Sequence, residues 1–405
     1  MSVYYIKAGW LFDGTGTSPL KNPLIIIKDG IIKKILPEND IESLSINYNY
    51  SNYYNFSDHI VLPPFIDSHV HLAMSGTCDP DIREKQLNYE YKEAFPIIYD
   101  HIKLHNLNGI IAVRDGGDYG GFTLKFTRSE KYFTDNIPMI IRSPGKAWRN
   151  EDRYGKLIGR SPSKGETLAE AILKDPILSD YTKIVNSGIN SLAEFGKLTP
   201  PQFTHNELKG AIAASSPKSV MVHANGPLPV LSAITAGATS IEHGFFAGDK
   251  ALGAMAEYGT VWVPTCITMD AYSKIMNKSN HSNDIAMKTL EHQLTQIAKA
   301  YNYGVTMAVG TDAGSIGVNH GISLSREIEL FIEAGVPISM AIRYATLEGA
   351  KLLGIDSSYG SVECNKFANL IGVKASLADL ASKIVSVRFI VTTVNGSIVV
   401  NSEKQ

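Results

Sequence analysis

Short runs of consecutive apolar residues, many of them β-branched, recur through the middle of the chain. Most of them lack alternation with polar residues, as is typical of parallel strands buried on both faces. They predict eight strands, at residues 61–68, 109–115, 138–143, 181–185, 219–223, 239–243, 260–265 and 305–312. Helical spacing of apolar residues predicts helices at residues 84–105, 168–173, 207–215, 229–236, 250–258 and 284–302. This α/β alternation fits a (β/α)8 TIM-like barrel and a doubly wound open sheet equally well.

Both ends of the chain have a different pattern, in which short β-rich runs are separated by turn residues. Asp29-Gly30 lies between two such runs near the start, and Asn395-Gly396 lies between two near the end. Both dipeptides are typical of tight hairpin turns. We therefore expect residues 1–60 and 363–405 to form one small composite β-sandwich domain, and residues 61–362 to form the barrel. Two unrelated extensions at the ends of the chain would give the same pattern and are the alternative.

The composition is that of a globular protein with a large core, since 44% of the 405 residues are apolar and 19% are charged. A formal net charge of −2 provides no basic surface, so we expect no nucleic-acid partner. Cys78, Cys266 and Cys364 are widely separated, which argues against a disulfide scaffold and against a cysteine zinc site.

The sequence also contains no pattern that predicts export or membrane insertion. Its N-terminus lacks a basic segment followed by an apolar one, and no apolar run reaches the length of a membrane span. We therefore expect a cytoplasmic protein that acts on a small molecule and does not bind membranes. A monomer and a homo-oligomer are both compatible with this composition.

Histidines at the ends of the predicted strands favour the barrel over the open sheet. Catalytic groups of a barrel come from the C-terminal ends of several strands, and His69, His71, His223 and His243 all lie at or just beyond such ends. His69 and His71 point to the same side of an extended segment, because side chains alternate along a strand. Exposed or structural histidines would give the same pattern one at a time, but together the four suit zinc or a similar divalent ion.

Lys183 and Asp312 are the other two candidate residues of this site. Lys183 lies within an apolar strand, where burial of a charged amine is costly. It either pairs with an acid or has a lowered pKa that makes the amine available for modification or nucleophilic attack. Asp312 follows the eighth predicted strand on a glycine-flanked turn. Opposite four histidines, its carboxylate is a natural metal ligand and proton acceptor.

The motifs that carry these residues resemble those of the amidohydrolase superfamily. Leu62-Pro63-Pro64-Phe65-Ile66-Asp67-Ser68-His69-Val70-His71 is similar to the opening strand of that superfamily. The motifs that follow in the same order are Val113-Arg114-Asp115-Gly116-Gly117, Lys183, Val222-His223-Ala224, Ile241-Glu242-His243-Gly244 and Gly310-Thr311-Asp312-Ala313-Gly314. Asn319-His320-Gly321 and Ala345-Thr346 look like the imidazolonepropionase-related branch, which includes prolidase-like dipeptidases that act on Xaa-Arg/Lys substrates.

The resemblance implies a site with two divalent ions, with zinc as the expected metal. It implies that His69, His71 and Asp312 hold the more buried ion, and that His223 and His243 hold the second. Lys183, carboxylated by carbon dioxide, would bridge the two ions. The implied reaction is hydrolysis of a C–N amide bond by a metal-bridging hydroxide, with Asp312 as the catalytic proton carrier. The substrate would be a dipeptide, an N-acyl amino acid or a cyclic amide.

The chain also departs from the superfamily pattern in ways that bear on the substrate. Pro64 stands where glycine is usual, and Glu363-Cys364-Asn365-Lys366-Phe367-Ala368-Asn369-Leu370 is an altered form of the usual tail motif. Residues 144–180 do not resemble the histidine-bearing loop of the Xaa-Arg dipeptidases.

We expect this loop, through Arg149, Arg153 and Tyr154, to bind a free carboxylate of the substrate together with His320. Solvated arginines, or arginines paired with Glu151 and Asp152, are the alternative.

Two other functional classes remain open from the sequence. A mononuclear deaminase or an imidazolonepropionase-like enzyme would use the histidines and Asp312 around one ion and would not need Lys183. A binding protein without catalytic activity would keep the fold but carry no metal. The presence of Lys183 favours the binuclear hydrolase.

Overall fold

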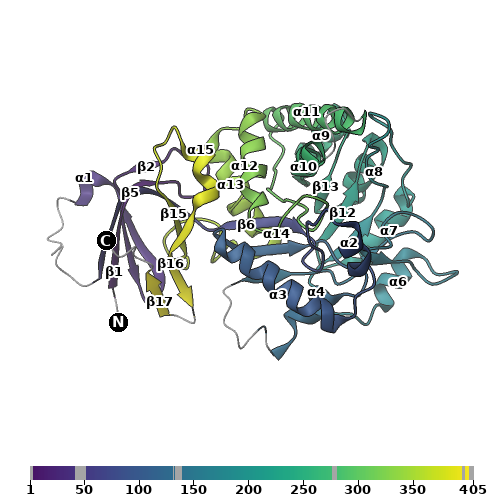
Figure 1. Ribbon diagram of the computed structural model, residues 1–405, viewed down its shortest axis with the longest axis horizontal. Helices are drawn as coiled ribbons and strands as arrows, with labels where there is room; N and C mark the ends of the chain where they lie inside the picture. Colours follow the sequence, from purple (N-terminus) through teal and green to yellow (C-terminus); the bar gives the residue numbers. More distant parts are fainter. Residues whose placement is uncertain are drawn as a thin grey trace. The chain divides into compact units, whose positions relative to one another are not determined.

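The computed structural model describes residues 3–41, 52–130, 132, 139–275, 281–394 and 397–400. The chain divides into two compact units, which we describe separately. The first comprises Met1–Ile66, His105–Ala112 and Pro337–Gln405, and the second comprises Asp67–Leu104 and Val113–Val336. Figure 1 colours the chain from the N-terminus (purple) to the C-terminus (yellow). The domain boundaries that the sequence analysis places after residues 60 and 362 stay a prediction.

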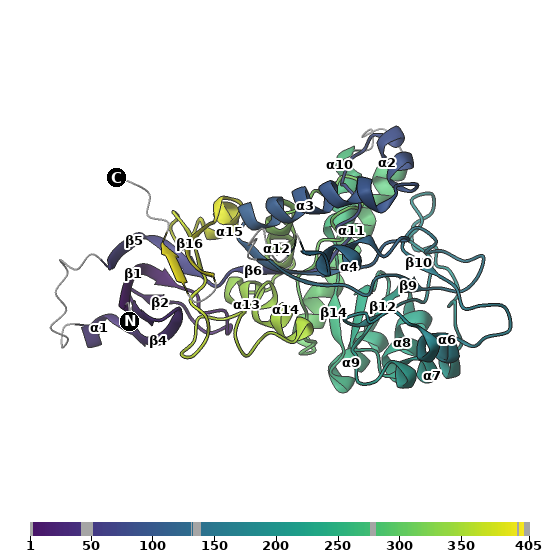
Figure 2. The ribbon, with the colours of Figure 1, turned by 90° about the horizontal axis from the view of Figure 1, so that it is seen from below.

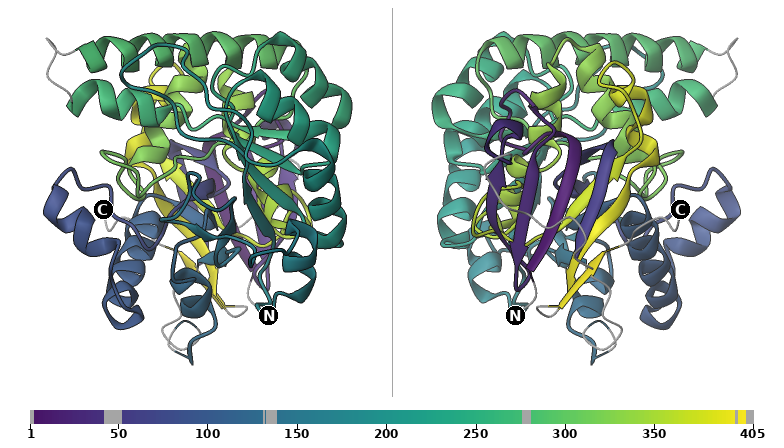
Figure 3. Two further views of the ribbon diagram at one scale, coloured as in Figure 1. Left: turned by 90° about the vertical axis from the view of Figure 1, so that its right-hand side faces the viewer. Right: turned by 90° about the vertical axis from the view of Figure 1, so that its left-hand side faces the viewer.

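The first unit contains one eight-stranded mixed sheet in the order β17-β16-β15-β5-β1-β3-β4, with β2 paired to β1. Its strands are β1 (Val3–Leu11), β2 (Leu20–Lys21), β3 (Leu24–Lys28), β4 (Ile31–Leu36), β5 (Tyr53–Leu62), β15 (Leu370–Val373), β16 (Arg388–Val394) and β17 (Ser397–Val400). β5 pairs in parallel with β1 and antiparallel with β15. Strands from the two ends of the chain therefore share one sheet, as the right-hand view of Figure 3 shows. Where the sequence predicts a sandwich, the described residues form a single hydrogen-bonded sheet.

Apolar side chains fill the core of this first unit. Ile6 of β1, Ile25 and Ile27 of β3 and Val391 of β16 belong to one buried cluster. The predicted turn at Asp29-Gly30 is present, since both residues have positive φ angles (52° and 77°) between the paired strands β3 and β4. The predicted Asn395-Gly396 turn lies outside the described residues. The helices of this unit are α1 (Glu38–Ile41), α13 (Ile338–Tyr344), α14 (Leu347–Leu353) and α15 (Leu380–Lys383).

The strands that carry the candidate site belong to the second unit, except that residues 65–66 and 110–112 at the starts of two of them belong to the first. A three-stranded sheet has the order β6-β7-β8, and a six-stranded parallel sheet has the order β10-β9-β11-β12-β13-β14. The strands are β6 (Phe65–Val70), β7 (Ile110–Asp115), β8 (Ile140–Arg142), β9 (Ala147–Trp148), β10 (Gly159–Arg160), β11 (Thr182–Val185), β12 (Val220–Ala224), β13 (Ser240–His243) and β14 (Val261–Val263). Seven of the eight predicted strands are thus present, although Pro138 of the third lies outside the described residues.

The prediction of an eighth strand at residues 305–312 is wrong. This segment makes only isolated bridges, one from Met307 to Trp262 of β14 and one from Ala313 to Val70 of β6. Its backbone hydrogen bonds are divided between two neighbours, since Thr306 and Ala308 bond to Trp262 of β14, whereas Val309 bonds to Ser68 and Asp312 to His69 of β6. These described residues form no continuous ladder with either strand. The segment still links the two sheets by hydrogen bonds, but the described residues do not form one continuous closed barrel sheet.

Helices cover the strands of the second unit. They are α2 (Pro80–Gln86), α3 (Tyr91–Leu107), α4 (Phe122–Thr127), α6 (Leu168–Lys174), α7 (His205–Ser215), α8 (Pro227–Ala236), α9 (Asp249–Tyr258), α10 (Ile267–Ile275), α11 (His281–Asn302) and α12 (Ser323–Glu333). Figure 2 shows α6 to α9 side by side along the six-stranded sheet. In the described residues, no helix combines the length and the apolar character that a membrane crossing requires.

One predicted helix, at residues 84–105, is two helices in the structure. α2 begins at Pro80, because the Asp79 carboxylate accepts hydrogen bonds from the first N–H groups of the helix and proline suits its first position. The chain leaves the helical conformation after Leu87 and enters α3 at Tyr91. Because of this break, the side chains of α2 do not follow the helical repeat of α3.

Candidate metal centre

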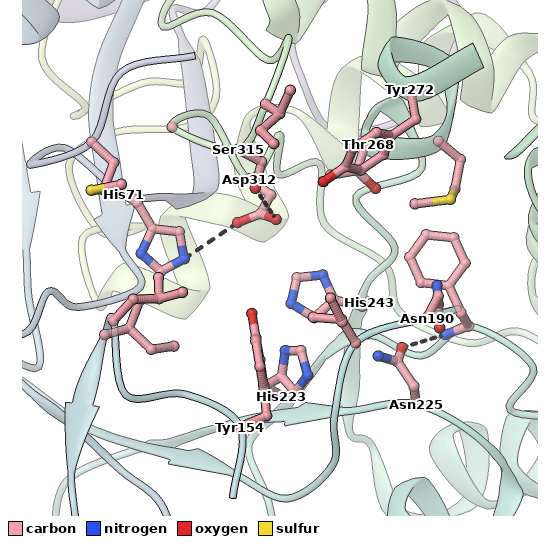
Figure 4. Close-up of a pocket in the computed structure, with 18 of the residues that line it drawn as sticks. His71, Tyr154, Asn190, His223, Asn225, His243, Thr268, Tyr272, Asp312 and Ser315 are labelled. Carbon is pink, nitrogen blue, oxygen red and sulfur yellow. Dashed lines mark hydrogen bonds and ion pairs between the residues drawn. The ribbon is translucent and has the colours of Figure 1, made fainter. Parts of the chain in front are cut away.

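Five of the six predicted metal ligands line one cavity of about 240 Å³ in the second unit, namely His71, Lys183, His223, His243 and Asp312. His69, the sixth, lies behind them, with its Nε2 atom 3.5 Å from Asp312 Oδ1. Neighbouring parallel strands bring them there, since Val185 of β11 lies opposite His223 of β12, and Ala224 of β12 lies opposite His243 of β13. Figure 4 shows the imidazoles of His71, His223 and His243 directed into the cavity together with the Asp312 carboxylate.

Three of these side chains form a compact set of donors. The Oδ1 atom of Asp312 lies 3.5 Å from His69 Nε2 and 3.3 Å from His71 Nε2. The three ligand atoms all lie within 4.8 Å of one another. His69 Nε2 is buried and has no hydrogen-bond partner in the described residues. A buried nitrogen without a partner beside a carboxylate and a second imidazole fits a divalent cation of the zinc type.

The remaining two histidines lie next to this set. The ring centroids of His223 and His243 are 4.5 Å apart, and those of His243 and His69 are 5.0 Å apart. Burial lowers the pKa of His243 to about 3 and that of His69 to about 4. These imidazoles are therefore neutral at neutral pH, which is the form that binds metal ions.

Partners on the far side of each ring fix the orientation of three histidines. The Nδ1 atom of His69 lies 2.6 Å from Glu242 Oε2, that of His71 lies 2.8 Å from the Gly117 carbonyl, and that of His243 lies 2.7 Å from Thr265 Oγ1. Each contact leaves Nε2 directed toward the cavity, as is usual for metal-binding histidines. His223 differs, because its Nε2 atom contacts the Gly188 carbonyl at 3.3 Å. Its Nδ1 atom is therefore the nitrogen available to bind a metal ion.

Glu242 and Arg114 form a fully buried network behind His69. Arg114 donates hydrogen bonds to Ser240 Oγ (2.8 Å) and Glu242 Oε1 (3.3 Å). Burial raises the pKa of Glu242, but its hydrogen bond with His69 and the charge of Arg114 lower that pKa to about 2 overall. Both residues belong to motifs noted in the sequence, yet no role was predicted for them. The signal that could have found them is a charged residue inside an otherwise apolar predicted strand.

Lys183 lines the cavity and is buried, with 1% of its surface exposed. It makes no ion pair with any residue that the structure describes. Burial lowers the pKa of its amine to about 8. A larger fraction of this amine is therefore neutral near neutral pH than for an ordinary lysine, and a neutral amine is the form that reacts with carbon dioxide.

Asp312 is held by an unusual backbone conformation and by its neighbours. Its φ angle is +58°, and its N–H donates to the His69 carbonyl at 2.7 Å. Ser315 Oγ donates to Asp312 Oδ2 at 2.8 Å. Burial raises the pKa of Asp312, but the hydrogen bond with His71 and the nearby imidazoles bring that pKa far below its usual range. The carboxylate is therefore ionised at neutral pH.

The predicted substrate-binding residues are divided between the cavity and other places. Tyr154 lines the cavity, with its ring centroid 5.4 Å from that of His223. Arg149 and Arg153 do not line it, and they donate instead to the backbone carbonyls of Asn150 (2.9 Å) and Pro200 (3.0 Å). Neither arginine pairs with an acidic residue in the described part of the chain.

His320 also lies away from the cavity wall. Its ring stacks on that of His101 at a centroid distance of 3.8 Å, and its Nε2 atom lies 2.7 Å from the Met74 carbonyl. The sequence analysis missed several polar residues of the cavity wall, namely Arg83, Asn190, Asn225, Thr268, Tyr272 and Ser315. Arg83 of α2 and Tyr272 of α10 are the two with large side chains. Both come from helices rather than from strand ends, so the strand-end pattern could not find them.

Comparisons with known proteins show which proteins the chain is similar to. Residues 157–399 match the Amidohydrolase family. An uncharacterized protein of Mycobacterium tuberculosis is 26% identical over 302 residues, which are 73% of this chain and 74% of that protein. Imidazolonepropionase of Picrophilus torridus is 24% identical over 373 residues, 85% of this chain and 86% of that enzyme. The crystal structure of a Xaa-Pro dipeptidase with methionine bound in its active site is 27% identical, with 99% of this chain and 100% of that chain covered and a TM-score of 0.78.

Proposed function

Because the chain belongs to the amidohydrolase family, we propose that it is a metal-dependent hydrolase that cleaves a C–N amide bond in a dipeptide, an N-acyl amino acid or a cyclic amide. The observation that carries this proposal is the set of three donors, His69, His71 and Asp312, within 4.8 Å of one another. The fold of the family, a TIM-like barrel with an additional domain, agrees with the strands of the second unit and the separate sheet of the first.

Two divalent ions, with zinc as the expected metal, are the proposed cofactors. His69, His71 and Asp312 would hold one ion, and His223 and His243 the other. Lys183, as a carbamate, would be shared between them. Bound ions of this type polarise the substrate carbonyl and lower the pKa of water, so that it attacks at neutral pH.

The side chains of the protein supply the proton transfer. Asp312 takes a proton from the attacking water and delivers it to the leaving amine. Its ionised state and its place beside both imidazoles suit this role, because a proton carrier has to lie within hydrogen-bond reach of the reacting atoms. Ser315 fixes the second carboxylate oxygen and so keeps Oδ1 directed toward the two histidines.

The rest of the cavity wall orients the substrate and limits the access of water. Ile158, Phe245 and Met269 are buried apolar residues of this wall. Burial raises the pKa of the Tyr154 hydroxyl, which therefore stays protonated and acts as a hydrogen-bond donor beside His223. We expect this hydroxyl to contact the substrate near the scissile carbonyl.

Metal content and a substrate screen test this function. The protein should be expressed with bicarbonate and either zinc or manganese, and screened against dipeptides, N-acyl amino acids and cyclic amides. We expect about two divalent ions per chain, and about one after Lys183→Ala, with most of the activity lost. An active Lys183→Ala variant with the same single ion as the unaltered protein would contradict the binuclear site.

The alternative is a mononuclear enzyme of the deaminase or imidazolonepropionase type. The likeness to the Picrophilus torridus enzyme favours keeping it as the second candidate. This alternative predicts one ion per chain, hydrolysis of a cyclic substrate but of no dipeptide, and full activity of Lys183→Ala. A protein that binds no metal under any of these conditions would contradict both candidates.

A further inference from the structure

The side chain of Arg83 reaches the wall of the cavity from α2. Its Nη1 atom donates hydrogen bonds to the backbone carbonyls of Ser75 (3.0 Å) and Gly314 (3.2 Å). A third, longer contact joins it to the Thr77 carbonyl (3.4 Å). These carbonyls come from the segments that follow the His69–His71 pair and Asp312. The position of the guanidinium is therefore fixed relative to the candidate metal ligands.

No carboxylate of the described residues pairs with Arg83, although the side chain is half-buried. Its other two nitrogens, Nε and Nη2, make no hydrogen bond to a described residue. Each of the other guanidinium groups close to the site has acceptors elsewhere: that of Arg114 pairs with Glu242, and those of Arg149 and Arg153 donate to backbone carbonyls away from the cavity. A partly desolvated cation without a counter-ion favours binding of an anion.

Tyr272 lies on the same wall and provides a second donor. Its side chain projects into the cavity from α10, on the side opposite Tyr154 (Figure 4). Its hydroxyl makes no hydrogen bond to a described residue. A guanidinium with two free nitrogens and a nearby phenol match the two oxygens of a carboxylate, which arginine binds in a bidentate manner.

We propose that Arg83, assisted by Tyr272, binds a free carboxylate of the substrate. The inference rests on the proposed hydrolase function and narrows its substrate to amides that carry a carboxylate, such as dipeptides and N-acyl amino acids. The sequence analysis gave this role to Arg149, Arg153, Tyr154 and His320, and the proposal assigns it to Arg83 of α2 instead. Arg83 is thus a specificity-determining residue, and the reaction itself does not need its charge.

Binding of acids and their amides to the metal-loaded protein tests this assignment without relying on turnover. The probes are free L-amino acids and N-acetyl-L-amino acids, each compared with its carboxamide by titration calorimetry. We expect Arg83→Met to weaken binding of the acids about 10- to 100-fold and to leave binding of the amides unchanged. Arg83→Lys should lose less, because it keeps the charge but not the bidentate geometry. Tyr272→Phe should weaken binding of the acids by about 3- to 10-fold.

Lys85→Met is the matched control, because Lys85 is an exposed cation on the same helix and does not line the cavity. It should bind every probe as the unaltered protein does. The proposal is overturned if no acid binds more tightly than its amide, or if Arg83→Met and Arg83→Lys affect acids and amides equally. It is also overturned if Arg149→Met or Arg153→Met, rather than Arg83→Met, removes the discrimination.

Kinetics separate this inference from the proposed function. With a hydrolysed dipeptide, Arg83→Met should raise KM about 10- to 100-fold and change kcat little. A protein that binds acids through Arg83 but hydrolyses no amide would keep the carboxylate site and contradict the hydrolase function. A hydrolase whose KM does not change in Arg83→Met would contradict the carboxylate site and leave the hydrolase function standing.

Discussion

The two units of this protein bury very different side chains. The core of the first unit consists of apolar residues such as Ile6 and Ile25, packed on a mixed sheet. The interior of the second unit at the strand ends buries His69, Lys183 and Glu242, all with 1% or less of their surface exposed. Burial of apolar surface stabilises a fold, whereas burial of charge costs free energy unless every group is paired. The comparison separates a region built for stability from one built for chemistry.

Some buried polar atoms of the second unit have no hydrogen-bond partner in the described residues. Glu242 and Asp312 both have partners, but His69 Nε2 and two nitrogens of Arg114 have none in the described residues. Each buried polar atom without a partner lowers stability by about 1–3 kcal/mol. We therefore expect a bound cation to stabilise the second unit, because it would satisfy His69 Nε2 and the Asp312 carboxylate at once.

The largest expected effect breaks the chemistry of the second unit while leaving its fold. Asp312→Asn keeps the shape of the side chain and tolerates the positive φ angle, but it removes the proton acceptor and weakens a metal ligand. We expect kcat to fall at least about 10²-fold. Steady-state kinetics, with metal content measured on the same sample, checks this.

Asp118→Asn is the control for that substitution. Asp118 is also a buried carboxylate of the second unit, but it accepts hydrogen bonds from the N–H groups that begin α4. Its replacement should lower stability and leave the kcat of the folded enzyme within about twofold, within the range for a residue remote from the reacting atoms. Near-normal turnover in Asp312→Asn would remove Asp312 from the mechanism.

The next effect is confined to the first unit. Ile25 is fully buried in its apolar cluster, so Ile25→Ala should lower the free energy of unfolding by about 2–5 kcal/mol. Because Ile25 does not line the cavity, kcat per folded molecule should stay unchanged. Urea denaturation and activity of the folded fraction measure the two quantities. A fall in kcat in a fully folded Ile25→Ala variant would show that the core of the first unit also affects catalysis.

A pH-dependent effect isolates the cost of burying Lys183. Its pKa of about 8 in the folded protein is below the ordinary 10.5, so the unfolded chain binds more protons between these values. The stability of the metal-free protein should therefore be lowest below pH 8 and rise as the pH goes from about 8 to about 10.5, by up to about 3 kcal/mol.

Lys183→Met should lack this rise. Urea unfolding at pH 7 and pH 10, in buffer free of bicarbonate, compares the two proteins. Equal pH dependence in both would mean that the amine is not desolvated in the folded state.

The sequence predicted those parts of the molecule whose physical cause lies within a few neighbouring residues. Seven strands and the turn at Asp29-Gly30 followed from local patterns, and the predicted metal ligands were noticed because polar residues ended apolar runs. The eighth strand failed because the backbone hydrogen bonds of residues 305–312 are divided between β14 and β6. No local pattern contains these contacts.

The substrate side of the site was less accessible to sequence reasoning. Arg83 is in the cavity only because the chain breaks between α2 and α3. Asp79-Pro80, a typical start of a helix, was the available signal for α2. Arg149 and Arg153 were attractive for their chemistry, but their hydrogen bonds direct them to backbone carbonyls, and only the three-dimensional arrangement determines such contacts.

The sheet of the first unit has a consequence for how the protein is made. β5 pairs on one side with β1, which emerges from the ribosome before it. Its other side pairs with β15, where Ile371 lies opposite Leu62, and β15 is synthesised about 300 residues later. At about 5–20 residues per second, this delay lasts about 15–60 s. During that time β5 has an open edge of unpaired N–H and C=O groups that can recruit another nascent chain. Translation speed and chaperone supply, rather than final stability, should therefore control the yield of this unit.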